Sequence, residues 1–321
     1  MPELPEVETF RRGLNQLTLK RKITGGDVLL HRTIAYPFSA EEFLNGIKGR
    51  EIISWYRCGK YLIAELTCPF FEDEERRKSK VETSPPSSPR HLRQRRQPPQ
   101  GNGSSVPSLL SSLGVHLRMT GQLLWLHQDE PLHKHTRVRL FFGEEWELRF
   151  VDQRTFGQMW WVPPQIPTQS IITGLAKLAA DPFSEEFTVE YLAEKLKNRR
   201  RAIKTALLDQ SIVAGLGNIY ADEALFLSGI RPETLCLNLQ LEQIERLYSS
   251  IIQVLETSIE AGGTTFSNFL NVKGVNGNYA HVAWVYNRTG KPCRVCSHPI
   301  ERIKLAGRSS HYSPLCQQMG G

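Results

Sequence analysis

The first nine residues of the chain place a nucleophile beside a proton carrier. If Met1 is removed, as a small second residue such as proline permits, the chain begins with the secondary amine of Pro2 and continues directly with the carboxyl group of Glu3. A terminal amine has an ordinary pKa of about 8 and is partly neutral at neutral pH, whereas a lysine amine has an ordinary pKa of about 10.4. Such an amine can attack a carbonyl or aldehyde carbon and form an iminium. The pattern is therefore compatible with covalent catalysis by Pro2, with Glu3 carrying protons.

Helical spacing follows these residues. Apolar side chains recur every three or four positions from Leu4 to Leu14, and proline at positions 2 and 5 suits the first turn of a helix. The amine should therefore lie at a helix N-terminus, where the positive end of the helix dipole disfavours an ammonium. Glu3 and Glu6 have the opposite effect, and the residue types do not decide which effect is larger. The acids of this turn, Glu8 included, are also typical of simple dipole compensation, so both interpretations stay open at this point.

The composition points to a large soluble protein that binds a polyanion. The 321 residues allow two domains, and 40 basic residues against 33 acidic ones give a net charge of +7 and a pI of about 9.1. This charge fits DNA, RNA or a membrane surface. Six cysteines are too few for a disulfide scaffold, and three of them lie near the C-terminus, which indicates metal binding in a reducing compartment. The sequence contains neither an apolar run of membrane-spanning length nor a signal peptide, so we expect a soluble, cytoplasmic, nucleoid-associated monomer.

Short runs rich in β-branched and aromatic residues dominate the first half of the chain. With the first helix they predict an N-terminal domain, residues 1–165, built as an antiparallel β-sandwich with flanking helices. The strands are expected at residues 23–30, 51–56, 61–66, 114–126 and 135–161, the last of these broken at 143–145. Lys60 lies at the tip of the turn between the second and third strands. Judged by its position in a turn, it is more often a solvated surface residue than a catalytic one.

An insertion interrupts this domain at about residues 71–111. Its composition changes to Ser, Pro, Gln and Gly, with eight Lys or Arg and five acids. Such a segment buries too little apolar surface to fold, so we expect it to be disordered. Its net charge of +3, eight minus five, makes it either a non-specific phosphate contact or a passive loop.

The second half of the chain has helical periodicity. Beyond a linker at about residues 163–170, we expect a helical domain over residues 171–285 and a separate hairpin over residues 286–321. The helices are expected at residues 188–197, 202–208, 220–228 and 241–255. The fold class is therefore α+β with two domains.

A glycine-rich turn joins two of these helices at residues 215–223, Gly-Leu-Gly-Asn-Ile-Tyr-Ala-Asp-Glu. Backbone amides at the start of the following helix can hold a phosphate, and the side chain of Asn218 adds a donor. A G-x-G pattern by itself is weak evidence, because it also suits a plain turn between helices. Arg199 and Lys204 precede the turn in a basic run and would extend a phosphate-binding surface.

Three cysteines near the C-terminus have the spacing of a metal finger. Cys293-x2-Cys296 and Cys316 fit a four-cysteine zinc ribbon with C-x2-C-x16-C-x2-C spacing, except that Ser313 occupies the third ligand position. A serine hydroxyl is a poor substitute for a thiolate because it is much harder to deprotonate. His311 would share the face of Ser313 in a regular strand, so either residue could complete the site. We expect one zinc ion, bound weakly or partially.

These motifs occur together in the order of a known family. Residues 1–9 resemble the N-terminal signature of the formamidopyrimidine-DNA glycosylase and endonuclease VIII family, residues 215–223 resemble its helix-two-turns-helix element, and the cysteine finger follows. On these motifs, which cover nearly the whole chain outside the insertion, the chain is identified as a member of the family, of a bacterial and cyanobacterial type. The resemblance implies a catalytic β-sandwich, a helix-two-turns-helix domain, a zinc-finger-like β-hairpin and damaged double-stranded DNA as the partner.

For the reaction, the resemblance implies a base-excision repair enzyme that removes oxidised purines such as 8-oxoguanine and formamidopyrimidines. Pro2 would attack C1′ of the damaged nucleotide while Glu3 moves protons at the sugar, leaving an iminium that allows β-elimination and then δ-elimination. Lys60 and Arg308 would assist through phosphate and proton contacts, and Glu6 would orient or tune the amine. Two alternatives remain: an endonuclease VIII-like enzyme for oxidised pyrimidines, and a catalytically silent binder of damaged DNA.

The resemblance also implies residues that hold the DNA while the damaged nucleotide is extruded. Met119 and Phe156 would fill the hole left by the base, and Arg154 would donate hydrogen bonds to the orphaned cytosine. Residues 264–279, which end at Tyr279, resemble a loop that caps a purine and argue against the pyrimidine alternative. The other DNA-contacting residues that the resemblance implies are His135, Arg199, Lys204 and Asn218.

Overall fold

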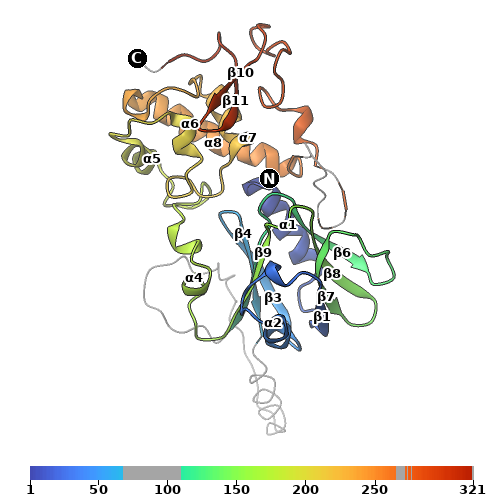
Figure 1. The fold of residues 1–321 in the computed structure, drawn as a ribbon. Helices are drawn as coiled ribbons and strands as arrows, with labels where there is room; N and C mark the ends of the chain where they lie inside the picture. Colours follow the sequence, from blue (N-terminus) through green and yellow to red (C-terminus); the bar gives the residue numbers. More distant parts are fainter. Residues whose placement is uncertain (68–109, 265–271, 273, 276, 320–321) are drawn as a thin grey trace, which may run out of the picture.

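The computed structural model describes residues 1–67, 110–264, 272, 274–275 and 277–319. A sheet-rich domain and a helical domain lie one above the other, and the N-terminus lies at their junction (Figure 1). The insertion expected at residues 71–111 lies outside the described residues, apart from its last two positions. In the part of the chain that is described, no helix combines the length and the apolar character that crossing a membrane requires.

Two β-sheets form the N-terminal domain. The first has the strand order β1 (Gly25–Val28), β7 (Thr136–Phe142), β8 (Trp146–Asp152) and β6 (Gly121–His127), all antiparallel. The second has the order β2 (Ile34–Tyr36), β9 (Gln158–Val162), β5 (Ser111–His116), β4 (Tyr61–Leu66) and β3 (Ile52–Cys58). Its pairs are antiparallel except for β2 with β9, which run parallel. The expected antiparallel β-sandwich is confirmed, with one parallel pair at a sheet edge.

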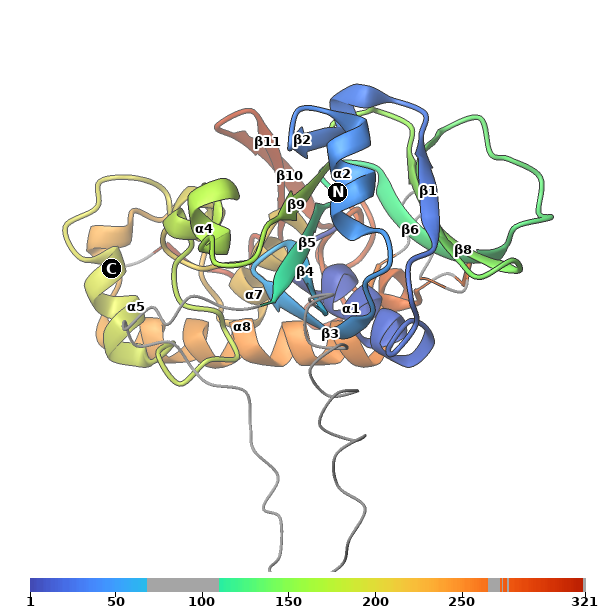
Figure 2. The same cartoon turned by 90° about the horizontal axis from the view of Figure 1, so that it is seen from below.

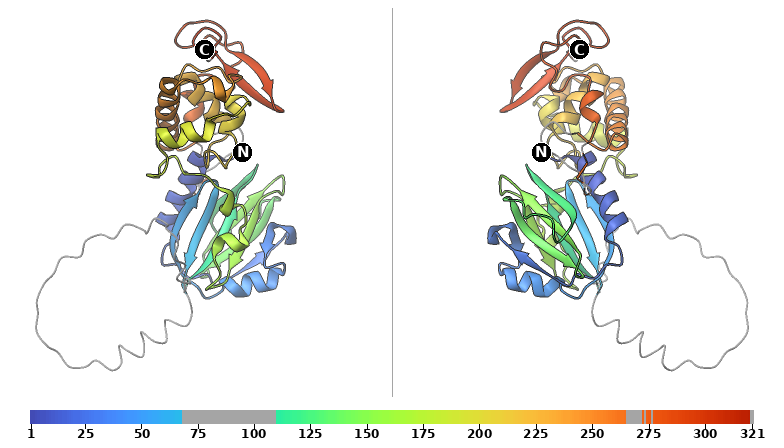
Figure 3. Two further views of the ribbon diagram at one scale, coloured as in Figure 1. Left: turned by 90° about the vertical axis from the view of Figure 1, so that its left-hand side faces the viewer. Right: turned by 90° about the vertical axis from the view of Figure 1, so that its right-hand side faces the viewer.

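The core of this domain lies between the two sheets and the first helix (Figure 3). Leu62 of the second sheet and Val138 of the first are fully buried in the same cluster. Helices α1 (Leu4–Leu17) and α2 (Ala40–Ile47) add apolar residues at helical spacing, among them Phe10. The packing therefore fixes α1 against the sheets while its first turn points to the other domain.

The helical domain follows the expected periodicity. Its helices are α4 (Thr168–Ile171), α5 (Val189–Leu196), α6 (Ile203–Leu207), α7 (Asn218–Leu227) and α8 (Leu241–Glu260), with 3-10 turns at Leu175–Lys177, Cys236–Asn238 and Tyr279–His281. Thr188 caps α5, because its hydroxyl accepts the N–H of Tyr191 at 3.1 Å. Figure 2 shows the long helix α8 running from α5 to α1, and it packs against both. The four helices expected from the sequence are confirmed, with shifted ends.

The C-terminal hairpin is a two-stranded sheet that packs on the helical domain. β10 (Glu301–Leu305) pairs antiparallel with β11 (Arg308–Tyr312), and β11 contacts α7. Ala306 and Gly307 form the turn with left-handed backbones, φ 45° and 79°. Arg308 follows this turn directly and is exposed at the tip of the hairpin.

The structure differs from the sequence-based expectation inside two strands. The strand expected at residues 114–126 is broken by a turn between β5 and β6, and a second turn separates β8 from β9. Arg118 (φ 54°) and Thr155 (φ 59°) adopt left-handed backbones in these turns, which an alternating apolar pattern does not reveal. α2 was also missed, because its eight residues are too few for a strong helical pattern.

Candidate active site

The N-terminal segment is inserted between the two domains. Leu4 is buried in the core of the helical domain, and its backbone N–H donates to the carbonyl of Gly215 at 3.0 Å. Gly215 has a left-handed backbone (φ 84°), and a Cβ there would lie 2.7 Å from Leu4 Cδ1, closer than packing allows. The glycine-rich turn therefore lets the start of α1 lie directly against the helical domain.

Glu3 lies at the N-terminus of α7. Its carboxylate accepts the backbone N–H of Ile219 at 3.1 Å and of Tyr220 at 3.5 Å, and the residue is 2% exposed. A helix N-terminus stabilises negative charge because its first amides have no partner within the helix. A Cβ on Gly217 would lie 2.2 Å from the carboxyl carbon of Glu3, so any side chain there would displace this carboxylate. Two of the amides that the sequence offered to a phosphate are thus bonded to Glu3 instead.

Glu6 is a second buried carboxylate in this region. It accepts the backbone N–H groups of Glu3 and Thr264, each at 2.8 Å, and the hydroxyl of Tyr220 at 2.5 Å. Burial and then the negative charge of Glu3 raise the pKa of Glu6 to about 7, although the hydrogen bond from Tyr220 lowers it. Glu6 can therefore take up or release a proton near neutral pH.

Lys60 comes from the turn between β3 and β4, and it is 7% exposed rather than solvated. Burial lowers the pKa of Lys60, whereas the negative charge of Glu3 raises it and the positive charge of Arg308 lowers it. These charges act on Lys60 together with that of Glu6. The predicted catalytic side chains therefore share one electrostatic neighbourhood, although they come from α1, the β3–β4 turn and β11.

A cavity of about 800 Å³ lies beside this cluster. Pro2 and Glu6 line it, as do Met119, Thr120 and His135 of the sheet domain. Cavities of this size hold small ligands or single building blocks of larger ones. The predicted nucleophile and two of the predicted DNA contacts thus face one space.

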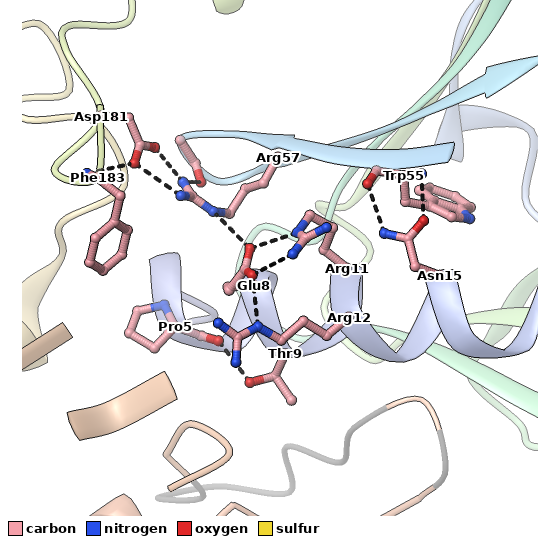
Figure 4. A network of polar contacts seen from close by, with 11 residues as sticks. Pro5, Glu8, Thr9, Arg11, Arg12, Asn15, Trp55, Arg57, Asp181 and Phe183 are labelled. Atoms are coloured by element: carbon pink, nitrogen blue, oxygen red, sulfur yellow. Dashed lines mark hydrogen bonds and ion pairs between the residues drawn. The ribbon is translucent and has the colours of Figure 1, made fainter. Parts of the chain in front are cut away.

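Arg57 holds the turn that carries Lys60 against both domains (Figure 4). Its guanidinium lies 2.5 Å and 3.0 Å from the two carboxylate oxygens of Asp181 in the helical part, and its Nε lies 3.5 Å from Glu8 of α1. Nη1 also donates to the carbonyl of Gly59 at 3.1 Å. The sequence alone does not predict this network, although the acidic residues of the first turn indicate that Glu8 has a basic partner.

Two neighbouring turns carry exposed side chains at the cavity end of the sheets. Met119 and Phe156 are 37% and 52% exposed, although both are large and apolar. The guanidinium of Arg154 lies over the Phe156 ring at 5.1 Å from its centroid. His135 follows on the next loop, where partial desolvation and the charge of Lys134 lower its pKa.

The hairpin is anchored through a buried ion cluster, which corrects the expectations for two residues. Lys204 was expected to extend a phosphate-binding surface, but it is fully buried; its ammonium lies 2.6 Å from Asp222 and donates to the carbonyl of Ser309 at 2.7 Å. His311 was expected near the metal, but its backbone N–H and ring Nδ1 lie 2.9 Å and 3.1 Å from Asp222. A basic run and strand alternation do not reveal a buried carboxylate elsewhere in the chain. Both residues hold β11, and with it Arg308, against α7.

The three predicted cysteine ligands converge. The sulfur atoms of Cys293, Cys296 and Cys316 lie within 4.8 Å of one another. Ser313 occupies the same corner, because its hydroxyl lies 3.4 Å from Cys296 Sγ and accepts the N–H of Cys316 at 3.4 Å. Within the described residues, this group contains no histidine, and the ring of the alternative ligand His311 bonds to Asp222 instead.

The remaining predicted contacts differ in exposure. Tyr279 is 2% exposed, its hydroxyl donates to Glu223 at 3.3 Å, and its ring packs edge-on against Tyr220 at 5.4 Å. This burial is at odds with the DNA contact expected of Tyr279, while most of the expected capping loop lies outside the described residues. Asn218 and Arg199 are half-buried near the start of α7 and after α5, and Oδ1 of Asn218 is itself buried.

Three protein-family models match the chain. The formamidopyrimidine-DNA glycosylase N-terminal domain matches residues 1–159, and the formamidopyrimidine-DNA glycosylase H2TH domain matches residues 178–269. The zinc finger found in FPG and IleRS matches residues 290–318. Together the three models cover most of the chain in the order of the observed domains.

Relatives and solved structures agree with these models. A formamidopyrimidine-DNA glycosylase of Nostoc punctiforme is 68% identical over 100% of this chain and 97% of its own, and one of Trichodesmium erythraeum is 56% identical over 99% and 100%. A Lactococcus lactis FPG variant bound to DNA containing Fapy-dG matches with a TM-score of 0.79 and 31% identity, over 99% of this chain and 100% of its own. The wild-type Lactococcus lactis protein bound to DNA containing an oxidised pyrimidine matches equally, with the same score, identity and coverage.

Proposed function

The chain belongs to the formamidopyrimidine-DNA glycosylase family, and we propose that the amine of Pro2 is the nucleophile with which it removes oxidised purines from DNA. The protein is a base-excision repair glycosylase with lyase activity, and double-stranded DNA with a damaged base is its partner. The observation that carries the role of Pro2 is the shared space: Pro2, Glu6 and Ile219 line the cavity, and Glu3 accepts the backbone N–H of Ile219.

Base removal requires that Met1 be absent, because the Pro2 nitrogen must be an amine. Its lone pair forms a bond to C1′ while the bond from C1′ to the base breaks, and the base leaves with that electron pair and gains a proton. The Pro2 nitrogen then gives its own proton to the Glu3 carboxylate, which passes it to O4′, so that the C1′–O4′ bond breaks, the sugar ring opens and an iminium forms between Pro2 and C1′. The N-terminus of α7 stabilises the carboxylate that remains on Glu3.

Strand cutting follows from the iminium, which acidifies C2′. Loss of a C2′ proton expels the 3′ phosphate by β-elimination, a second proton loss expels the 5′ phosphate by δ-elimination, and water releases the sugar fragment from Pro2. Lys60 and Arg308 contact the phosphates that leave, since both are basic side chains and the charge of Arg308 acts on Lys60. Glu6, with a pKa of about 7, orients the amine and exchanges protons with it.

The DNA contacts divide between the domains, which we place at residues 1–165, 171–285 and 286–321. Met119 and Phe156 fill the space that the extruded nucleotide leaves, and Arg154 donates to the orphaned cytosine. The exposure of the two apolar side chains supports this role. Phosphate contacts come from His135, Arg199 and Asn218, none of which is fully buried.

The finger holds one zinc ion, weakly or partially. The family model is that of a zinc finger, and three thiols at one corner fit a tetrahedral zinc site. The Ser313 hydroxyl lies where the fourth donor belongs, and it is a harder and less easily deprotonated ligand than a thiolate. When bound, zinc cross-links the base of the hairpin to the loop before it.

Borohydride trapping tests the nucleophile. On a duplex with 8-oxoguanine opposite cytosine, the wild-type protein should form a covalent adduct, because reduction converts the iminium to a stable amine. Pro2→Gly, or a protein that retains Met1, should lose this adduct, whereas the exposed control Pro167→Gly should keep it. Equal trapping by a Pro2-blocked protein would assign the nucleophile to another amine.

Oxidised pyrimidines are a second lesion class to test, since a relative has been crystallised with one. A matched duplex with thymine glycol should be processed more slowly than the 8-oxoguanine duplex. Faster excision of thymine glycol would favour the endonuclease VIII-like alternative, and failure to process either duplex would favour a silent binder.

A further inference from the structure

The turns that carry Met119 and Phe156 share one buried carboxylate, that of Asp152 at the end of β8. Asp152 is 1% exposed. Its Oδ1 accepts the hydroxyl of Thr120 and the backbone N–H of Arg154, the latter at 3.2 Å, and its Oδ2 accepts the N–H of Gly157 at 2.7 Å. One side chain therefore bonds to both turns at once.

The backbone of Asp152 holds the third DNA-facing loop. Its N–H donates to the carbonyl of His135 at 2.9 Å, and its carbonyl accepts Nε of Arg137 at 2.8 Å. The same guanidinium donates to the ring Nδ1 of His135 at 3.2 Å, which fixes the ring orientation. The residues proposed to touch DNA from the sheet domain thus meet at Asp152, although they come from three separate loops.

These turns need the hydrogen bonds to Asp152 because their backbones are strained. Arg118 and Thr155, each next to a proposed wedge residue, have left-handed φ values of 54° and 59°. Side chains other than glycine disfavour that region, and such residues persist where the surroundings over-determine them. The hydroxyl of Thr120 adds a direct link, since it also accepts the N–H of Arg154 at 2.9 Å.

Close packing leaves the second turn little freedom. A Cβ on Gly157 would lie 2.4 Å from Phe150 Cζ and 3.1 Å from Asp152 Oδ2. The turn that contains Gly157 therefore packs closely against Phe150 and the Asp152 carboxylate. This packing fixes the backbone from which Phe156 and Arg154 project. Movement of Asp152 would move both.

We propose that Asp152 is a positioning residue for opposite-base discrimination, holding the turn of Met119, the loop of His135 and the turn of Arg154 and Phe156 in one arrangement. It does not touch DNA itself, because it is buried. The inference rests on the proposed function, in which Arg154 bonds to the orphaned cytosine. Without Asp152, Arg154 no longer distinguishes cytosine from adenine, while the chemistry at Pro2 continues.

The Asp152→Asn variant tests this, because it keeps the shape of the side chain but presents an NH2 group to an N–H donor. Single-turnover excision of 8-oxoguanine is measured opposite cytosine and opposite adenine. The ratio of the two rates should fall at least about fivefold, the lower range for loss of a base-specific hydrogen-bonded pair. Cutting at a preformed abasic site should stay within about threefold of wild type, since it bypasses base release.

Variants at Thr120 separate positioning from folding. Thr120→Val should lower the same ratio and Thr120→Ser should restore it, and the double variant with Asp152→Asn should add little, because both changes break one network. Asp129→Asn, whose side chain is 90% exposed, is the matched control and should leave the ratio unchanged. If Asp152→Asn does not fold, the two Thr120 variants decide.

An unchanged ratio in both Asp152→Asn and Thr120→Val would overturn the proposal. So would an equal loss of excision and of abasic-site cutting, which would make Asp152 a general structural residue. If wild type forms no borohydride adduct, the role of Pro2 fails, whereas the ratio still tests Asp152, because it depends on the turns and not on which amine reacts.

Discussion

Two regions carry residues of the family signature: the N-terminal centre, around Glu3 and Glu6, and the cysteine corner of the finger, formed by Cys293, Cys296 and Cys316. They differ in how readily one of their residues can be substituted. At the N-terminal centre, Glu3 and Glu6 are each 2% exposed and accept hydrogen bonds from several segments of the chain. At the finger, Cys296 and Cys316 are half-buried and Ser313 stands in for a cysteine. A substitution of Glu3 or Glu6 would break several hydrogen bonds between segments of the chain. At the finger, in contrast, a metal-ligand position already holds a serine.

The finger can tolerate serine at position 313 because the hairpin that carries Arg308 is also anchored away from the cysteines. The hairpin that carries it is held from its inner side, where Asp222 bonds to Lys204 and His311. The cysteine corner lies beyond the other end of β11. We infer that the position of Arg308 depends on Asp222 first and on zinc second.

Glu3→Gln should have the largest effect of the changes that compare these regions. The amide keeps the shape of the side chain and one oxygen for the start of α7, but it cannot deliver a proton to O4′. Base excision should fall by roughly two to four powers of ten, the usual range for acid–base catalysis, while DNA affinity stays near wild type. Single-turnover excision and a binding titration measure the two quantities.

The exposed Glu194→Gln, which loses a surface carboxylate, serves as the control for that change. A collapse of DNA affinity in Glu3→Gln would make the carboxylate a structural group. The centre would then resemble the finger, as a scaffold and not as a reactive site.

Asp222→Asn should have a smaller but clear effect on both stability and cutting. It leaves the buried ammonium of Lys204 without its counter-charge, which costs about 3–5 kcal/mol and lowers the melting temperature by on the order of 10 °C. Strand cutting below that temperature should fall about tenfold, because a small displacement of a positioned group is costly. Thermal melting and abasic-site cutting are the measurements.

A partly exposed ion pair near the finger gives the control for Asp222. Glu233→Gln removes one partner of Arg231 and should change stability by at most about 1 kcal/mol. If Asp222→Asn melts and cuts like wild type, the hairpin is not anchored there, and the comparison between the two regions fails.

The sequence predicted those parts of the site that rest on local patterns. The proposal that Pro2 is the nucleophile rests on the resemblance of residues 1–9 to the family signature, whereas the helices and most strands follow from periodicity. The cysteine ligands follow from spacing, and the structure brings their sulfur atoms together as expected. Each of these signals is contained within a few tens of residues.

What the sequence did not predict depends on partners that are distant in the chain. Lys204 looked exposed because it lies in a basic run, yet its counter-charge Asp222 lies on α7 and buries it. His311 looked like a metal ligand because strand alternation puts it on the face of Ser313, yet the same Asp222 binds its ring. Asp152 and Arg57 were missed for the same reason, since burial and tertiary hydrogen bonds give them their roles.

Restoring the fourth thiol should have the smallest effect on activity and a clear effect on metal. Ser313→Cys completes a four-cysteine set, so zinc should become stoichiometric and resistant to a chelator that strips the wild-type protein. Excision and cutting should stay within about threefold of wild type in both proteins, with or without zinc, because Asp222 still holds Arg308. Metal analysis before and after chelation, with activity on the same samples, measures this.

Two controls make this last comparison decisive. His311→Ala should leave zinc content unchanged, since the ring bonds to Asp222 and not to the cysteine corner, whereas Cys316→Ser should abolish binding by removing a second thiol. Full chelator-resistant occupancy in wild type would show that the Ser313 hydroxyl serves as well as a thiolate. Loss of cutting on chelation would show that zinc, and not Asp222, fixes Arg308, and the two regions would then be equally intolerant of change.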